Sequence, residues 1–364
     1  MVVFLMIACS PVPAATEAVT ERSATLAAPA GTPLPPTPEP TPTIVRTPPA
    51  LPGLYQSTQL HPLDIPRSYI QDTCQYLRNK WNPFSAQPGT VVMIIMLQSI
   101  YKGPVEETGG IFVGDLNIFM DELKRQSFVA INTKQLLAFM ERNVYIPQRS
   151  VLIIQDSRRQ ADNFNKHFRG YWENWGWPVV NGFPSQPDTP ESLWQENAQL
   201  ENEGWVYHQA QGVMIGGSMN DDTSKAILTR ELQGPKDAFA QYFHKNPIAI
   251  IWPGGGFGLR PVQAARELGY QLGFTTNSRG PVMYNWVPQA DALDPERPAY
   301  APEAAIGDPL MTLPRYWPSQ VLQSIDKVRI MGNEAAALAQ ANKDIELEYY
   351  DIVCVPTHGP IPKP

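Results

Sequence analysis

From about Ile65 onward, short continuous apolar runs alternate with segments in which apolar residues recur every three or four positions. Runs such as VVMIIML (91–97) and VLIIQD (151–156) are typical of strands buried on both faces of a parallel sheet. Segments such as DLNIFMDELKRQSF (115–128) place their apolar residues near one helical face. The β-α-β-α order therefore predicts a mostly parallel sheet with helices outside, either a barrel or a doubly wound sheet.

The positions of Pro and Gly and the spacing of apolar residues predict further elements. The segment 190–204 begins with Pro and ends with Gly, which indicates a helix. The segment 223–243 predicts a helix that we expect to be interrupted at Gly234-Pro235. No internal repeat is evident, and the Pro-rich part from about Gly280 gives no clear pattern. The remaining predicted strands are 178–183, 205–214, the start of 248–256 and 271–276, and the remaining predicted helices are 134–143 and 261–270.

The N-terminus has an apolar segment, MVVFLMIA, that ends at Cys9. It is too short to span a bilayer but matches the end of a signal-peptide apolar core. Residues 6–9, MIAC, resemble a bacterial lipobox, whose cysteine receives a diacylglycerol and becomes the mature N-terminus. No Lys or Arg precedes Arg22, so the basic part of a signal peptide is missing. Residues 1–9 are therefore interpreted as a signal-peptide end with a lipobox, and the alternative is a frayed apolar terminus.

Residues 10–55 are rich in Pro, Thr and Ala and lack apolar periodicity. Such a segment predicts a disordered, extended, polyproline-like stalk, which a surface lipoprotein needs between its anchor and its domain. The alternative is a disordered tail without an anchor. We expect the globular domain to cover 65–320 and a C-terminal extension, of no predicted role, to cover 321–364.

Composition narrows the classes of partner and compartment. The formal net charge of the 364 residues is −7, and 43% of them are hydrophobic, so a sizeable core can form. An acidic, evenly mixed chain does not indicate nucleic-acid binding or binding to an anionic membrane. Membrane contact is expected only through the lipid anchor. Cys74 and Cys354 could pair in an oxidising compartment or remain as free buried thiols, and their spacing does not decide.

Six local motifs carry a resemblance to a known family. In chain order they are VVMIIMLQSI, VLIIQDSRR, VYHQAQGVMI, IIWPGGG, RELGYQLGFTT and PLMTLPRYWP. Together, over roughly residues 89–318, they resemble the NodB-like polysaccharide deacetylases (carbohydrate esterase family 4). The resemblance implies a distorted (β/α) barrel. In that family one Asp and two His hold a divalent metal such as zinc, which activates water, while a second Asp serves as general base and a further His as general acid.

The family's catalytic positions are mostly changed in this sequence. Asp156 keeps the general-base position, but Ser157 replaces the metal-binding Asp. Gln211 and Ile215 stand at the two metal-binding His positions. Ser and Gln are weak ligands, and Ile offers no lone pair. The resemblance therefore implies that the metal site is lost, that Asp156 is vestigial and that no cofactor is bound.

Other residues are candidates for contact with a carbohydrate ligand. Gln98 stands where the family's opening strand usually offers His, and Gly254 replaces an aromatic residue of a Tyr-Pro-Tyr-Gly loop. Trp252 lies in the same loop, and indole rings stack on sugars. Arg315 could bridge to Asp156 or hold an anionic sugar. The candidate substrate-binding residues are Gln98, Gln211, Trp252 and Arg315.

These patterns lead to one preferred function and two alternatives. We expect an exported, membrane-anchored lipoprotein of the bacterial cell envelope that is catalytically inactive and binds an envelope or extracellular glycan. One alternative is an active carbohydrate deacetylase with a rearranged metal site around Asp156 and His208. Against it, His208 and Gln211 would point to opposite faces of a strand. The other alternative is a scaffold that docks another envelope protein. The sequence predicts neither the glycan nor the oligomeric state.

Overall fold

The computed structural model describes residues 46–157 and 160–363. The part from Arg46 onward forms one compact unit. Cys9, the lipobox and most of the predicted stalk lie outside the described residues, so their interpretation stays a prediction. The unit nevertheless begins inside the predicted stalk, because Leu51 and Tyr55 already pack on buried clusters.

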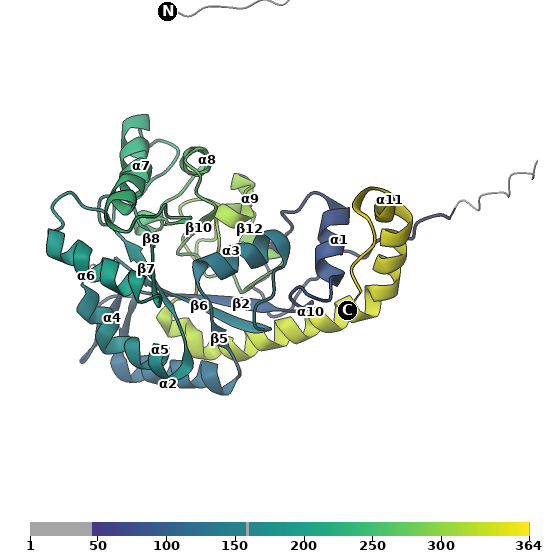
Figure 1. The fold of residues 1–364 in the computed structure, drawn as a ribbon, viewed down its shortest axis with the longest axis horizontal. Coiled ribbons are helices and arrows are strands. Elements are labelled where there is room, and N and C mark those ends of the chain that lie inside the picture. Colours follow the sequence, from purple (N-terminus) through teal and green to yellow (C-terminus); the bar gives the residue numbers. More distant parts are fainter. Residues whose placement is uncertain (1–45, 158–159, 364) are drawn as a thin grey trace, which may run out of the picture. The chain divides into compact units, whose positions relative to one another are not determined.

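A mostly parallel sheet forms the centre of the molecule (Figure 1). Its strand order is β10-β9-β8-β7-β6-β2-β11, with β5 also paired to β6, and only β11 runs antiparallel to its neighbour. These strands are β2 (Val91–Leu97), β5 (Val129–Ala130), β6 (Arg149–Asp156), β7 (Val179–Phe183), β8 (Val206–Ala210), β9 (Ala249–Ile251), β10 (Leu272–Phe274) and β11 (Val282–Met283). Two small sheets pair β1 (Asp64–Arg67) with β12 (Val287–Ala290) and β3 (Ser99–Tyr101) with β4 (Gly110–Phe112).

The continuous apolar runs form the middle of this sheet, as their composition predicts. Every residue of β2 is buried, and β2 pairs in register with β6 from Val91↔Arg149 to Leu97↔Gln155. Because both faces of these strands are covered, neither shows polar alternation.

Residues 313–316 join the edge strand β10 to β2, next to the part of β2 that pairs with β11. Leu313 forms a parallel bridge with Phe274 of β10, and Tyr316 forms one with Ile95 of β2. The sheet therefore curls into a distorted barrel, and the predicted fold is confirmed.

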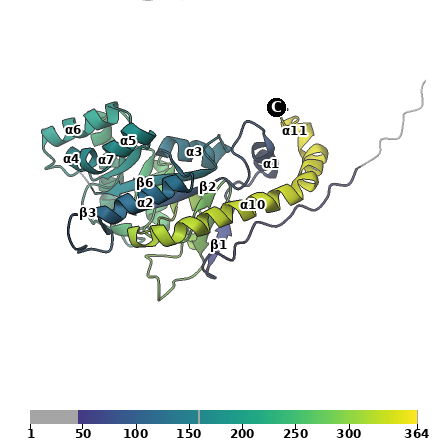
Figure 2. The same cartoon turned by 90° about the horizontal axis from the view of Figure 1, so that it is seen from below.

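The helices cover the outside of the sheet (Figure 1). Figure 2 shows α10 lying alongside α2, and the two helices are in contact. The helices are α1 (Thr73–Trp81), α2 (Val113–Arg125), α3 (Thr133–Arg142), α4 (Ala161–His167), α5 (Arg169–Trp175), α6 (Glu191–Asn202), α7 (Lys225–Tyr242), α8 (Leu259–Glu267), α9 (Glu303–Ile306), α10 (Val321–Tyr349) and α11 (Val355–His358), with short 3-10 turns at Pro253–Gly255, Pro309–Met311 and Pro318–Gln320.

Helix α7 differs from its prediction, because Pro235 lies inside a continuous helix of 18 residues. The proline removes one backbone hydrogen bond. The helix persists because Pro235 itself is buried, together with Leu228, Leu232 and Phe239.

The C-terminal region packs onto the barrel within the same compact unit. The first half of α10 packs Val321, Ile325 and Val328 into the cluster that contains Val91 of β2. After α10, a π-helical segment (Tyr350–Cys354) reaches α1, and a disulfide joins Cys74 to Cys354 with 5.2 Å between their Cα atoms. The spacing of the two cysteines did not decide whether they pair, and the structure contains the disulfide.

Within the described part of the chain, no helix combines the length and the apolar character that a bilayer crossing requires.

Candidate functional site

The candidate site lies where parallel strands of the barrel end. Asp156 is the last residue of β6, Gln98 follows β2 and Gln211 follows β8. Strand β8 is shorter than predicted and ends at Ala210. Because parallel strands end at the same edge, the structure brings Asp156, Ser157 and Gln211 together, and this edge carries the active sites of α/β barrels.

Asp156 forms a buried ion pair with Arg315. The Arg315 Nη1 lies 2.6 Å from Asp156 Oδ1, and the two side chains are 0% and 4% exposed. Arg315 Nε also donates to the carbonyl oxygen of Thr275 at 2.6 Å, whereas its Nη2 is buried without a hydrogen-bond partner in the structure. Of the two roles considered for Arg315, the bridge to Asp156 is the one observed.

Ser157 and Gln211 form a second polar pair beside this ion pair. The backbone N–H and the hydroxyl of Ser157 donate to Gln211 Oε1 at 2.7 and 2.9 Å. Ser157 adopts a left-handed backbone conformation with φ of 55°. A Cβ atom placed on Gly182 of β7 would lie 3.3 Å from Gln211 Oε1 and 3.6 Å from Asp156 Oδ1. Asp156, Ser157 and Gln211 therefore converge around this glycine.

This donor set does not fit a divalent cation. The Gln211 oxygen accepts two hydrogen bonds, and the Asp156 carboxylate is paired with a guanidinium. Ile215, at the other position of a metal-binding His, is a hydrocarbon that is 51% exposed. Zinc and similar ions prefer imidazole and carboxylate ligands. The described residues also contain no group of three or more His, Cys, Asp or Glu placed to hold a metal ion.

The other two candidate ligand contacts have different surroundings. Gln98 sits in the corner between β2 and β3, where its N–H donates to the Gly109 carbonyl at 2.8 Å and its side chain fills the space beside Gly109. Trp252 is 1% exposed, and its indole N–H donates to the Met311 carbonyl at 2.8 Å. Trp252 therefore packs in the core and does not line a groove, contrary to expectation.

His208 is on the other side of the sheet from the candidate site. It is fully buried, with Nδ1 2.9 Å from Glu201 Oε2 and Nε2 2.8 Å from Asn197 Oδ1, and both partners belong to α6. His208 and Gln211 therefore lie on opposite sides of the sheet, as predicted. A rearranged metal site around Asp156 and His208 has no geometric basis in the described residues.

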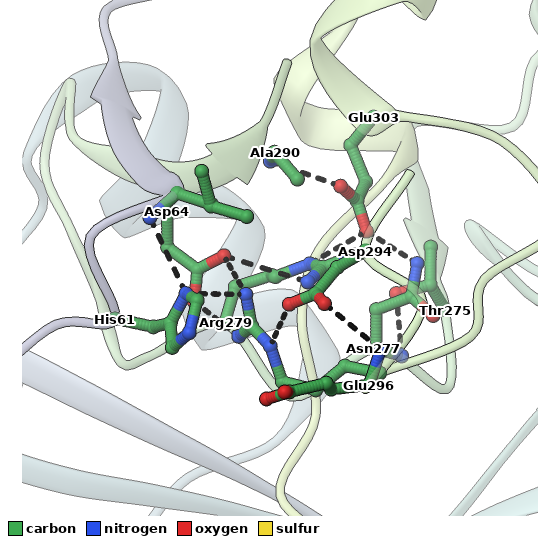
Figure 3. A network of polar contacts seen from close by, with 11 residues as sticks. His61, Asp64, Thr275, Asn277, Arg279, Ala290, Asp294, Glu296 and Glu303 are labelled. Atoms are coloured by element: carbon green, nitrogen blue, oxygen red, sulfur yellow. Dashed lines mark hydrogen bonds and ion pairs between the residues drawn. The ribbon is translucent and has the colours of Figure 1, made fainter. Parts of the chain in front are cut away.

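A buried charged network, which the sequence did not predict, includes Asp64, Asn277, Arg279 and Glu303 (Figure 3). The Arg315 N–H donates to the Asn277 carbonyl at 3.1 Å, and the Asn277 amide donates to Glu303. Arg279 joins Glu303, at 3.1 Å, to Asp64, at 3.4 Å. Asp64 is more than 200 residues away in the sequence from Arg279. These residues lie in regions without apolar periodicity, so the network becomes visible only in the folded chain. It fixes the backbone that positions Arg315.

Comparisons with known proteins identify the fold. No family model and no curated protein sequence matches the chain. Among solved structures, the Streptococcus pyogenes deacetylase PplD in complex with acetate is similar, with 18% identity, a TM-score of 0.50 and coverage of 66% of this chain and 99% of that chain. The de-N-acetylase from Aggregatibacter actinomycetemcomitans is also similar, with 14% identity, a TM-score of 0.51 and coverage of 65% and 99%. This chain has a NodB-like deacetylase fold.

The NodB-like deacetylase fold accounts for about two thirds of the chain, since the two neighbours cover 66% and 65% of it. Both neighbours are matched over almost their whole length, so the shared part is a complete fold unit. At this level of identity the likeness concerns the fold alone. The roles of Asp156, Gln98 and Gln211 remain predictions from the residues themselves.

Proposed function

We propose that this protein binds a glycan of the bacterial cell envelope through a NodB-like deacetylase fold and does not deacetylate it. The observation that carries the proposal is the pair of contacts at the strand ends. Asp156 is neutralised by Arg315, and Gln211 is held by Ser157. Amide hydrolysis in this fold family needs a metal-activated water, and free water has a pKa of about 15.7. A serine, a glutamine and an isoleucine cannot supply that activation.

The same edge retains groups suited to carbohydrate hydroxyls. The oxygen of Gln211 is held by Ser157, which leaves its amide nitrogen to donate to a ligand. Side-chain amides donate and accept hydrogen bonds without carrying charge, so they suit neutral sugars.

Export and anchoring belong to the proposal as well. The Cys74–Cys354 disulfide supports an oxidising compartment, where such bonds persist. We place the anchor at Cys9, at the end of an apolar segment that resembles a lipobox. Replacing Cys9 by Ala should move the protein from the membrane fraction to the soluble fraction in the producing bacterium, and unchanged fractionation would remove the anchor from the proposal.

The functional test measures binding and hydrolysis on the same purified full-length chain. Calorimetry with N-acetylated chitin and peptidoglycan oligomers should detect binding, while acetate release stays at background with and without added zinc. Gln211→Ala should weaken binding by about fivefold, since a lost hydrogen bond costs on the order of 1 kcal/mol. The matched control Gln195→Ala changes an exposed glutamine on α6 and should have no effect.

Two outcomes would contradict the proposal. Acetate release that stops on addition of chelator would show that a working metal site exists. Absence of binding at millimolar oligomer would favour the protein-docking scaffold instead. As a positive control for metal binding, the triple variant Ser157→Asp, Gln211→His, Ile215→His restores the family's ligand types, and elemental analysis should find more zinc in it than in the unchanged protein.

A further inference from the structure

A second pocket lies at the opposite end of the barrel from Asp156. Gln87 lies four residues before β2, and Gln148 immediately precedes β6, so both lie near the amino ends of parallel strands. The end of α1 and the second half of α10 complete the walls of this open pocket, and its volume is about 600 Å³. We call this the α10 pocket. Its volume lies in the range of small-molecule sites in proteins, roughly 300–1,000 Å³.

The charge of the α10 pocket contrasts with that of the chain. Its lining contains Lys80 and Lys343 and no carboxylate, whereas the whole chain has a formal net charge of −7. Lys80 is paired with the buried Glu346 at 2.8 Å. Lys343 has no carboxylate partner among the described residues, and its ammonium lies 5.4 Å from the centre of the Trp81 ring. Lys343 therefore offers a free positive charge to a ligand.

Trp81 holds this arrangement in place. Its indole N–H donates to Glu346 at 2.7 Å, which fixes the ring. The ammonium groups of Lys80 and Lys343 lie 5.2 and 5.4 Å from the centre of the ring. A cation–π contact restrains an ammonium without satisfying its hydrogen-bond donors. The Lys343 charge is thus positioned in advance for an anionic group.

Three glutamine side chains supply hydrogen-bonding groups without a partner in the described structure. They are Gln87, Gln148 and Gln340, and each lines the α10 pocket. An amide can both donate and accept, which matches the hydroxyl groups of a sugar.

We propose that the α10 pocket binds a saccharide unit that carries a carboxylate. Lys343 pairs with the carboxylate, and the amides of Gln87, Gln148 and Gln340 bind the hydroxyl groups. This site is separate from the strand-end site of the proposed function, because the two lie at opposite ends of the same parallel strands.

The test uses the full-length chain, a galacturonic acid trisaccharide and the methyl ester of that trisaccharide, with binding measured by calorimetry at low salt. The acid should bind and the ester should bind much more weakly. Lys343→Gln should weaken binding of the acid by about 10- to 100-fold, the range for losing a charge-assisted hydrogen bond, and leave the ester unchanged. Gln340→Ala should weaken binding of both. A parallel titration with monomeric galacturonate distinguishes a free sugar acid from a unit of a polymer.

Matched controls separate this proposal from the previous one. Lys327→Gln removes an exposed charge from the same helix, outside the α10 pocket, and should leave the affinity unchanged. Gln211→Ala, at the strand-end site, should also leave it unchanged. Equal affinity for acid and ester, or equal effects of Lys343→Gln and Lys327→Gln, would overturn the proposal. Loss of binding in Gln211→Ala alone would assign the acid to the strand-end site.

Discussion

Glu201 shows how single side chains are matched to buried surroundings. Burial by itself would raise the pKa of this carboxyl, but the hydrogen bond with His208 and the nearby ammonium of Lys245 outweigh burial and lower the pKa to about 2. The ammonium lies 2.5 Å from Glu201 Oε1, and the His208 ring lies 2.9 Å from Oε2. The His208 contact anchors α6 to β8, and the Lys245 contact anchors α6 to the segment between α7 and β9.

This shift predicts a pH dependence of stability. A carboxyl whose pKa is lower in the folded chain stabilises it above the unfolded pKa of 4.5, and this contribution disappears as the pH falls toward 2. The full contribution is on the order of 3 kcal/mol. We expect Glu201→Gln to be less stable than the unchanged protein near pH 6, and the difference to shrink as the pH falls to about 3. Urea unfolding at a series of pH values measures it.

The control for this prediction is Glu196→Gln, an exposed glutamate on the same helix. Its stability should follow that of the unchanged protein at every pH. A difference between Glu201→Gln and the unchanged protein that stays constant from pH 6 to pH 3 would refute the assignment.

Some site residues could be placed from the sequence and others could not. Asp156 and Ser157 directly end or follow an apolar run, so the strand pattern alone puts them at the edge of the sheet. Gln211 was predicted to lie inside a strand over 205–214, and it reaches the edge because β8 ends at Ala210. Trp252 also follows a strand, but its N–H donates to the Phe274 carbonyl at 3.1 Å and continues the ladder. This additional backbone hydrogen bond to β10 directs the indole into the core. The residues around Trp252 in the sequence show no pattern that predicts the hydrogen bond.

At the scale of elements, the contact between α10 and the barrel depends on two glycines. A Cβ atom on Gly332 of α10 would lie 2.8 Å from the carbonyl oxygen of Gly89, and a Cβ on Gly89 would lie 2.4 Å from the carbonyl oxygen of Gly332. The helix therefore approaches the start of β2 more closely than any side chain would permit.

This contact predicts opposite effects for two Gly→Ala substitutions in helices. Gly170→Ala in α5 meets no atom within 4 Å and should stabilise the protein by about 0.5–1 kcal/mol, the usual gain in helix propensity. Gly332→Ala should instead destabilise it by about 1–3 kcal/mol, because the added methyl group meets the Gly89 backbone. Chemical denaturation of both variants measures the two changes. A stabilised Gly332→Ala protein would show that α10 can move away at little cost.

Elements were predicted correctly where a short stretch of sequence contains the whole apolar pattern. The long buried strands β2 and β6 and the helices with a clear apolar face were predictable from short windows. Helix α10 was missed, although it is the longest helix described, because its buried residues are concentrated in its first half and the second half is largely polar. Its position is decided by its packing on β2 and by the contacts of Glu346 with Lys80 and Trp81 of α1, and both elements lie far away in the sequence.

On the scale of the whole molecule, the disulfide joins the first helix to the last turns of the chain. Cys74 and Cys354 are 280 residues apart. Reduction, or the variant Cys74→Ala, Cys354→Ala, should lower the free energy of unfolding by about 2–5 kcal/mol. Hydrogen exchange should increase first in α1 and in Tyr350–Cys354. Uniform exchange with unchanged stability would mean that packing alone holds the ends together.

Completion of the barrel by residues 313–316 has a consequence for biosynthesis. While a chain emerges from the ribosome, the edge of β10 and the part of β2 beyond its pairing with β11 stay open until almost all of it has been made, because their bridging partners Leu313 and Tyr316 come late. Open strand edges invite pairing with other chains. Truncated or stalled chains that end before this segment should therefore depend on chaperones and be removed by proteases, even though most of their strands are already present.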